Sequence, residues 1–149
     1  MDKTVVRVGA LLAPLVLAVG CSPRDEHPPP AQAHPPTTIV VDDQTIDVAP
    51  LTEAVAGLCQ AREEAATDTR AATTTYDRRS RQGIDTTARV LQRSNARLAS
   101  SMVTAVDRVQ ADLAAGPGNR ALGQDLARLT ELMREGLARL GISTPACAR

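Results

Sequence analysis

Apolar residues recur at spacings of three and four in segments between Leu51 and Leu140. This spacing places them on one face of an α-helix, and it restricts the fold more than any other feature of the chain. Gly116-Pro117-Gly118 interrupts the pattern and is a strong helix stop. The sequence therefore predicts an all-α domain over residues 51–149.

Turn residues divide this region into four expected helices. Thr67-Asp68 ends the first helix and caps the second, Asn119 caps the fourth, and Gly141 ends it. Gly83 lies inside the second helix and should weaken it by about 1 kcal/mol relative to Ala. We expect helices at 51–66, 69–92 and 95–115, and a fourth between Asn119 and Gly141, packed as a small up-down-up-down helical bundle.

Residues 1–20 have a different character. A positively charged start precedes an apolar run from Val8 to Gly20, which is shorter than the roughly 20 residues that a membrane-spanning helix needs. The small residues Ala18 and Gly20 stand before Cys21. This order is typical of a secretory signal peptide, which we assign to residues 1–20.

Leu17-Ala18-Val19-Gly20-Cys21 resembles the lipobox of bacterial membrane lipoproteins, with Ala18 where Leu is usual. The resemblance covers residues 1–21 only. It implies cleavage before Cys21, a diacylglyceryl group on its sulfur and an acylated new amino terminus. Stable anchoring takes more than one acyl chain, which agrees with this pattern. We expect the exported chain to be lipid-anchored at the extracytoplasmic face of the bacterial cell membrane.

The chain has three cysteines. If lipid occupies Cys21, Cys59 and Cys147 are left as one pair, and an exported context favours a disulfide between them. The long loop that this bond closes makes it worth about 4 kcal/mol in the chain-entropy model. A redox-active or metal-binding pair is the alternative, but the chain has no Cys-x-x-Cys spacing.

The number of helices depends on the region of Asn95. The apolar spacing continues without a slip from Ile84 to Val109, which favours one long helix and a bundle of three long helices. A turn at Asn95 gives segments of well-matched length. It also returns the C-terminus to the start of the first helix, where Cys147 would approach Cys59. We therefore expect four helices, with three as the alternative.

Residues 21–50 are expected to form a Pro-rich tether between the lipid and the bundle. Proline-rich chain of this kind favours extended, poorly packed conformations. His27 and His34 each precede a proline, and we interpret them as solvated linker residues rather than metal ligands.

One part of the tether is β-prone. Thr37–Val41 and Thr45–Val48 flank Asp42-Asp43-Gln44. The pattern is consistent with a short hairpin, with a strand that docks on a partner, or with apolar chain lying over the bundle.

Composition limits the core and the partners. Phe and Trp are absent and Tyr76 is the single aromatic residue, so the core must be aliphatic. The whole chain carries 17 basic and 17 acidic residues, and residues 1–20 remove only Lys3, Arg7 and Asp2. The mature chain is thus close to neutral, which argues against nucleic acid as a partner.

The domain contains few side chains that are suited to catalysis. It contains no His and no Lys, and Glu63-Glu64 are neighbours that do not face each other on a helix. Phosphate loops, zinc spacings and the Glu-x-x-His motif are missing from the sequence. We expect no enzyme activity, no metal and no cofactor.

An arginine-rich run is the remaining surface feature. Acid precedes base by four residues from Asp77 to Arg81 and from Asp85 to Arg89, a favourable order for helix ion pairs. We interpret the run as a solvated face; the functional alternative is contact with anionic lipid or wall polymer. The arginines concerned are Arg78, Arg79, Arg81, Arg89, Arg93 and Arg97.

Three functions follow as hypotheses. The first is a lipid-anchored binding or accessory component of the cell envelope, with an envelope protein as its partner. The second is a lipoprotein that holds a small molecule or lipid between its helices, where the Ala and Thr side chains of the second helix leave room. The third, which the sequence favours least, is an envelope enzyme that uses carboxylates.

Overall fold

The computed structural model describes residues 36–147. Residues 1–20, Cys21, His27 and His34 lie outside these residues, so the expected signal peptide and the interpretations placed on the other three stay predictions.

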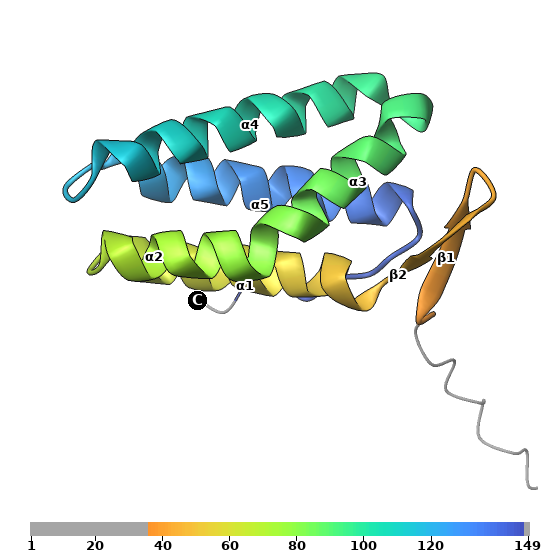
Figure 1. Ribbon diagram of the computed structural model, residues 1–149, viewed down its shortest axis with the longest axis horizontal. Helices are drawn as coiled ribbons and strands as arrows, with labels where there is room; N and C mark the ends of the chain where they lie inside the picture. The colour runs from red at the N-terminus through yellow and green to blue at the C-terminus, as the bar shows by residue number, and fades with distance from the viewer. Residues whose placement is uncertain (1–35, 148–149) are drawn as a thin grey trace, which may run out of the picture. The chain divides into compact units, whose positions relative to one another are not determined.

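Four helical stretches run through the described residues, and successive stretches run in opposite directions (Figure 1). The predicted up-down-up-down bundle is therefore confirmed. The second stretch is continuous from 69 to 94 but changes its winding in the middle. The elements are α1 (Ala49–Ala65), α2 (Thr69–Thr75), the π-helical turn η1 (Tyr76–Ser80), α3 (Arg81–Ser94), α4 (Ala96–Ala115) and α5 (Ala121–Arg139).

Side chains and glycines end the helices where the sequence predicted. The carboxylate of Asp68 accepts hydrogen bonds from the backbone N–H groups of Arg70 at 2.9 Å and Ala71 at 3.0 Å, which caps α2. Gly116 follows α4 with φ +83°, a left-handed conformation that glycine adopts without steric cost. Gly141 follows α5 with φ +75°.

The alternative of three long helices is wrong. Asn95 has φ −151° and ψ 69°, which breaks the helix, and its side-chain oxygen accepts a hydrogen bond from the N–H of Leu98 at 3.1 Å. Asn95 is thus the N-cap of α4 and not a polar residue in a helical seam. The continuous apolar spacing arises because α3 and α4 each present an apolar face to the same core.

The π-helical turn was not predicted. It begins at Tyr76, whose side chain is 1% exposed in the core. Beyond it, α3 leaves the direction of α2 and crosses to α4, as Figure 1 shows. A change in helix winding is a recognised cause of such a redirection. Consequently α2 packs chiefly against α1, whereas α3 packs against both α1 and α4.

The β-prone segment forms a hairpin. Strands β1 (Thr38–Val41) and β2 (Gln44–Asp47) pair antiparallel, with Ile39 opposite Ile46. Asp42 and Asp43 form the two-residue turn, with φ of 49° and 63°. Ile39 and Ile46 pack against the helical core. Two strands alone are marginal, so this packing holds the hairpin in place.

The core is aliphatic, as predicted, and Tyr76 is its one aromatic member. The side chain of Met133 from α5 and that of Met102 from α4 are both fully buried. The other large, fully buried side chains are those of Leu51, Val55, Leu58, Ile84, Leu91, Leu122, Leu126, Leu129 and Leu137.

Two glycines let α1 approach the second helical stretch closely. A Cβ added at Gly83 would lie 2.6 Å from the carbonyl oxygen of Pro50 and 2.6 Å from Cβ of Ala54. A Cβ added at Gly57 would lie 2.8 Å from Cβ of Arg79. Gly83 is therefore required by packing, although by local propensity it weakens the helix.

The predicted pairing of Cys59 with Cys147 is present as a disulfide, with the two Cα atoms 5.4 Å apart and a sequence separation of 88. After α5 the chain turns back and runs along α1 (Figure 1), which carries Cys147 to Cys59. The four-helix topology makes this possible because α5 ends beside the start of α1.

Among residues 36–147, the helices all fall short of the length and apolar content needed to cross a bilayer.

Candidate functional site

The six arginines singled out in the sequence do not form one stripe. Arg97 lies on α4 beyond the break at Asn95, whereas the others lie on η1 and α3. Ion pairs engage three of the six: Arg79 with Glu53 at 2.5 Å, Arg93 with Asp42 at 3.3 Å, and Arg81 with Asp77 at 3.9 Å.

These ion pairs have structural roles. Arg79 joins η1 to α1 and also donates to the side chain of Gln60. Arg93 joins the hairpin turn to the end of α3. The predicted pair of Asp85 with Arg89 does not come within ion-pair distance. Arg78, Arg89 and Arg97 are left without an ion pair to any described residue.

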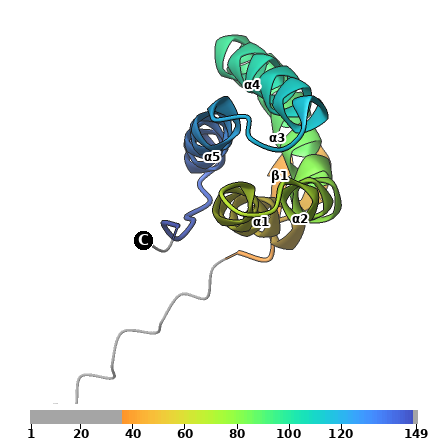
Figure 2. The same cartoon turned by 90° about the vertical axis from the view of Figure 1, so that its left-hand side faces the viewer.

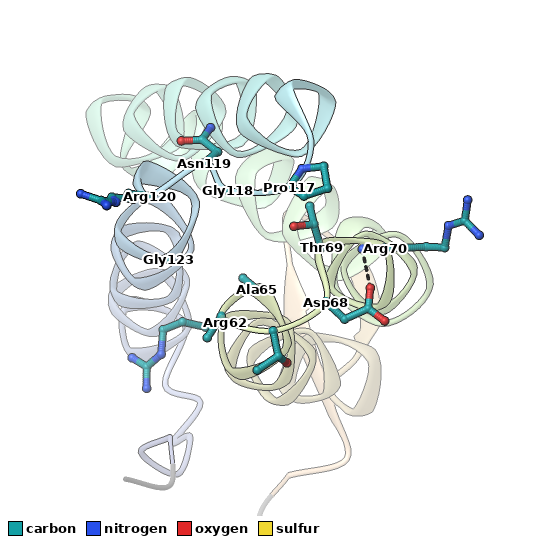
Figure 3. A pocket seen from close by; sticks show the side chains of 12 residues that line it. Arg62, Ala65, Asp68, Thr69, Arg70, Pro117, Gly118, Asn119, Arg120 and Gly123 are labelled. Atoms are coloured by element: carbon teal, nitrogen blue, oxygen red, sulfur yellow. Dashed lines mark hydrogen bonds between the residues drawn. The ribbon is translucent and has the colours of Figure 1, made fainter.

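A hollow of about 530 Å³ opens at the end of the bundle opposite the hairpin (Figure 3). Two connections meet there, the α1–α2 turn and the α4–α5 loop. Figure 2 views the bundle from this end and shows α1 and α2 side by side, with α4 across the bundle from them at the top of the view. The lining residues are Arg62, Ala65, Ala66, Thr67, Asp68, Thr69, Arg70, Pro117, Gly118, Asn119, Arg120 and Gly123.

The hollow has a cause in the fold. Because α2 packs on α1 and the chain reaches α4 only after η1, the bundle is less filled at the α2 end. Small side chains leave the space open: Ala65 on α1, Gly118 in the loop and Gly123 on α5. A Cβ at Gly123 would meet no atom within 4 Å.

The rim of the hollow carries more positive than negative charge. Arg62, Arg70 and Arg120 make no ion pair with any residue in 36–147. Asp68 is the one carboxylate in the lining, and its oxygen already caps α2. Figure 3 shows the three guanidinium groups extending away from the hollow, while their backbones form its edge.

Asn119 fixes the loop on one side of the hollow. Its side-chain oxygen accepts a hydrogen bond from the N–H of Ala121 at 3.0 Å, at the start of α5. Its amide nitrogen donates to a carboxylate oxygen of Asp112 at 2.8 Å. Asn119 is not the N-cap that the sequence predicted, because Arg120 holds that position without a side-chain cap. Asn119 stands one residue earlier and links α4 to α5.

Behind Asn119, Asp112 of α4 meets Asp125 of α5. Burial, the hydrogen bond to Asp112 and its negative charge raise the pKa of Asp125, and Arg108 opposes them. Two neighbouring carboxyl groups of like charge favour retention of one proton. Asp125 also lines a smaller hollow of about 230 Å³ between α4 and α5.

Two hydroxyl groups lie buried near η1. Burial raises the pKa of Tyr76 to about 12, opposed by the side chain of Gln110 and the charge of Arg81. Ser80 is 0% exposed, and its hydroxyl has no hydrogen-bond partner among the residues that the structure describes. Asp77 of η1 and Asp85 of α3 line a shallow hollow of about 370 Å³ on the surface of this helical stretch.

Within residues 36–147, His, Cys, Asp and Glu side chains form no group of three or more that could hold a metal ion.

Sequence reasoning did not single out Arg62, Arg70 or Arg120. A signal was nevertheless present. An up-down-up-down order places the end of the first helix, the start of the second and the 116–120 loop at one end of the bundle, and each carries one of these arginines.

Protein-family models, curated proteins and solved structures, when compared with this chain, give no match.

Proposed function

We propose that this chain is an exported lipoprotein that is anchored through Cys21 and works by binding, as an accessory component of the bacterial cell envelope. The observation that carries the proposal is the disulfide between Cys59 and Cys147. Disulfides persist in oxidising, extracytoplasmic compartments and are rare in the cytosol. This agrees with the lipobox-like sequence at residues 17–21.

The fold supports a binding role. The helices are held by an aliphatic core and by the disulfide, so the bundle presents a fixed surface. Residues 21–35 separate Cys21 from the first described residues. With lipid on Cys21, the predicted Pro-rich tether would serve as a spacer between the membrane and the bundle.

Replacing Cys21 with alanine tests the anchor. In cell fractionation, Cys21→Ala should leave the membrane fraction, whereas the control Cys147→Ala, which keeps the lipobox, should stay with it. Retention of Cys21→Ala in the membrane would show that the anchor does not depend on this cysteine.

Cross-linking tests the accessory role. Wild-type protein cross-linked in intact membranes should recover a defined envelope protein. Recovery of the same set of proteins with an unrelated lipid-anchored control would argue against a specific partner.

A second function, binding of a small molecule, is favoured by the hollow between the α1–α2 turn and the α4–α5 loop. Its walls come from the helix ends rather than from the Ala and Thr residues along the second helix, apart from Thr69. Thermal unfolding in the presence of a panel of small molecules should reveal a ligand that raises the melting temperature.

Arg78, Arg89 and Arg97 have no ion pair among the described residues and are available to contact anionic lipid or wall polymer. Binding of the protein to anionic vesicles should weaken as salt rises from 0.05 M to about 0.5 M, because salt screens exposed charges. Salt-independent binding would leave the arginines without this role.

A further inference from the structure

We propose that the hollow at the α1–α2 and α4–α5 end binds a small organic anion, with its phosphate or carboxylate group at the arginine rim and its apolar part inside. The inference rests on the proposed binding function and names the class of ligand.

The size and walls of the hollow suit such a molecule. Its volume of about 530 Å³ lies within the range of roughly 300–1,000 Å³ that is common for small-molecule sites. Ala65, Ala66, Pro117 and Gly123 make its walls largely apolar. An apolar body of a few carbons would bury against them, and a wholly hydrated ion would not.

The charge of the rim selects an anion. The backbones of Arg62, Arg70 and Arg120 lie at the edge of the opening, and ion pairs to other described residues do not hold their side chains in place. Asp68 does not offset them fully, because it contributes one negative charge against three positive ones. The net positive charge of this rim disfavours cationic ligands.

The arginines must turn toward the ligand. Figure 3 shows their side chains directed outward. Arg70 and Arg120 are exposed, and exposed side chains change rotamer within nanoseconds. A guanidinium group binds phosphate or carboxylate through two parallel hydrogen bonds. These bonds would stabilise the inward rotamer of the arginine once an anion is present.

Titration calorimetry on the purified full chain tests the inference, with butyl phosphate, butyrate, butanol and inorganic phosphate as probes and detergent alone as the blank. We expect butyl phosphate or butyrate to bind at least about tenfold more tightly than butanol, because the charged hydrogen bonds are lost in the alcohol. Inorganic phosphate should bind about tenfold more weakly than butyl phosphate, because it buries no methylene groups.

The stronger of the two organic anions identifies the head group. Equal affinity for butanol and the anions would overturn the charge argument. Equal affinity for inorganic and butyl phosphate would overturn the role of the apolar walls, and absence of binding by either organic anion would overturn the inference as a whole.

Variants locate the site. Arg70→Gln and Arg120→Gln should each weaken binding of the better anion about tenfold. Arg139→Gln is the matched control, because Arg139 is exposed and lies at the opposite end of α5 from Arg120 and the hollow. Equal weakening by all three would show diffuse charge attraction instead of a site.

Gly123→Leu tests the hollow itself. Its Cβ meets nothing within 4 Å, so the variant should fold and place its side chain in the space the ligand would use. Circular dichroism confirms folding, and binding should then be lost. A folded Gly123→Leu protein that binds as the wild type does would place the ligand elsewhere.

These measurements separate the two proposals. They use purified protein and do not depend on the membrane anchor. Loss of anion binding with Cys21-dependent anchoring intact would remove this inference and leave the lipid-anchored role in place.

Discussion

Replacing Gly83 with alanine sets local helix propensity against tertiary packing. In an isolated helix the change should stabilise by about 1 kcal/mol, because alanine restricts the unfolded chain and favours the helix. In the folded protein the new Cβ would lie 2.6 Å from the carbonyl oxygen of Pro50 and 2.6 Å from Cβ of Ala54. Neither atom is the flexible end of a long side chain, so α1 or α3 must shift.

The size of the effect follows from these two contributions. Overpacking of a tight contact costs about 1–3 kcal/mol. After the gain in propensity, Gly83→Ala should be destabilised by about 0–2 kcal/mol. Gly123→Ala is the matched control, because Gly123 also lies within a helix and its Cβ would meet no atom within 4 Å. It should be stabilised by about 0.5–1 kcal/mol.

The difference between the two variants therefore isolates the packing cost. We expect about 1–3 kcal/mol in the free energy of unfolding. For a domain of this size, this corresponds to a gap of about 4 °C or more in the melting temperature. Urea unfolding and thermal unfolding of the purified protein, followed by circular dichroism, measure both quantities. If Gly83→Ala is stabilised as much as Gly123→Ala, the close approach of α1 and α3 is refuted.

Three further predictions concern the disulfide and two titrating groups. Reduction of the Cys59–Cys147 bond should lower the free energy of unfolding by about 4 kcal/mol. Non-reducing mass spectrometry should recover the two cysteines in one linked pair of peptides, and two free thiols would contradict the pairing. Because the folded state raises the pKa of Asp125, its contribution to stability is complete below the ordinary carboxyl pKa and is lost as pH rises through the raised one. Asp125→Asn should therefore gain stability over the wild type at pH 7 but not at about pH 3, and an equal difference in urea unfolding at both values would contradict the raised pKa of Asp125. Tyr76 is the single tyrosine and the chain has no tryptophan, so the absorbance of its phenolate should titrate near its folded pKa of about 12 and return to about 10 in denaturant; a midpoint of 10 without denaturant would mean that the ring is not buried.

Local signals located most of the elements. Asp68 and Gly116 mark helix ends because their conformations and hydrogen bonds are set within a few residues. Asn95 shows the limit of such signals. Its apolar neighbours fit one continuous face, and the decision to break the helix depends on α3 and α4 packing against the same core.

Function-bearing features were harder to predict. The arginines of η1 and α3 have a regular spacing, but their partners Glu53 and Asp42 come from distant parts of the chain. Because Arg79 and Arg93 pair with these carboxylates, they hold structural elements together instead of forming part of a free basic surface. The pKa of Asp125 likewise depends on Asp112, which lies on another helix.

The sequence by itself determined the all-α class of the fold, most helix ends, the aliphatic core and, once Cys21 is assigned to lipid, the pairing of Cys59 with Cys147. Each of these follows from periodicity, from turn residues or from the small number of candidates. Tertiary structure alone decided the π-helical turn, the packing of the hairpin and the need for glycine at position 83. It also decided the hollow with its three arginines, because open space arises where helix axes diverge, and no local pattern records the distance between two helices.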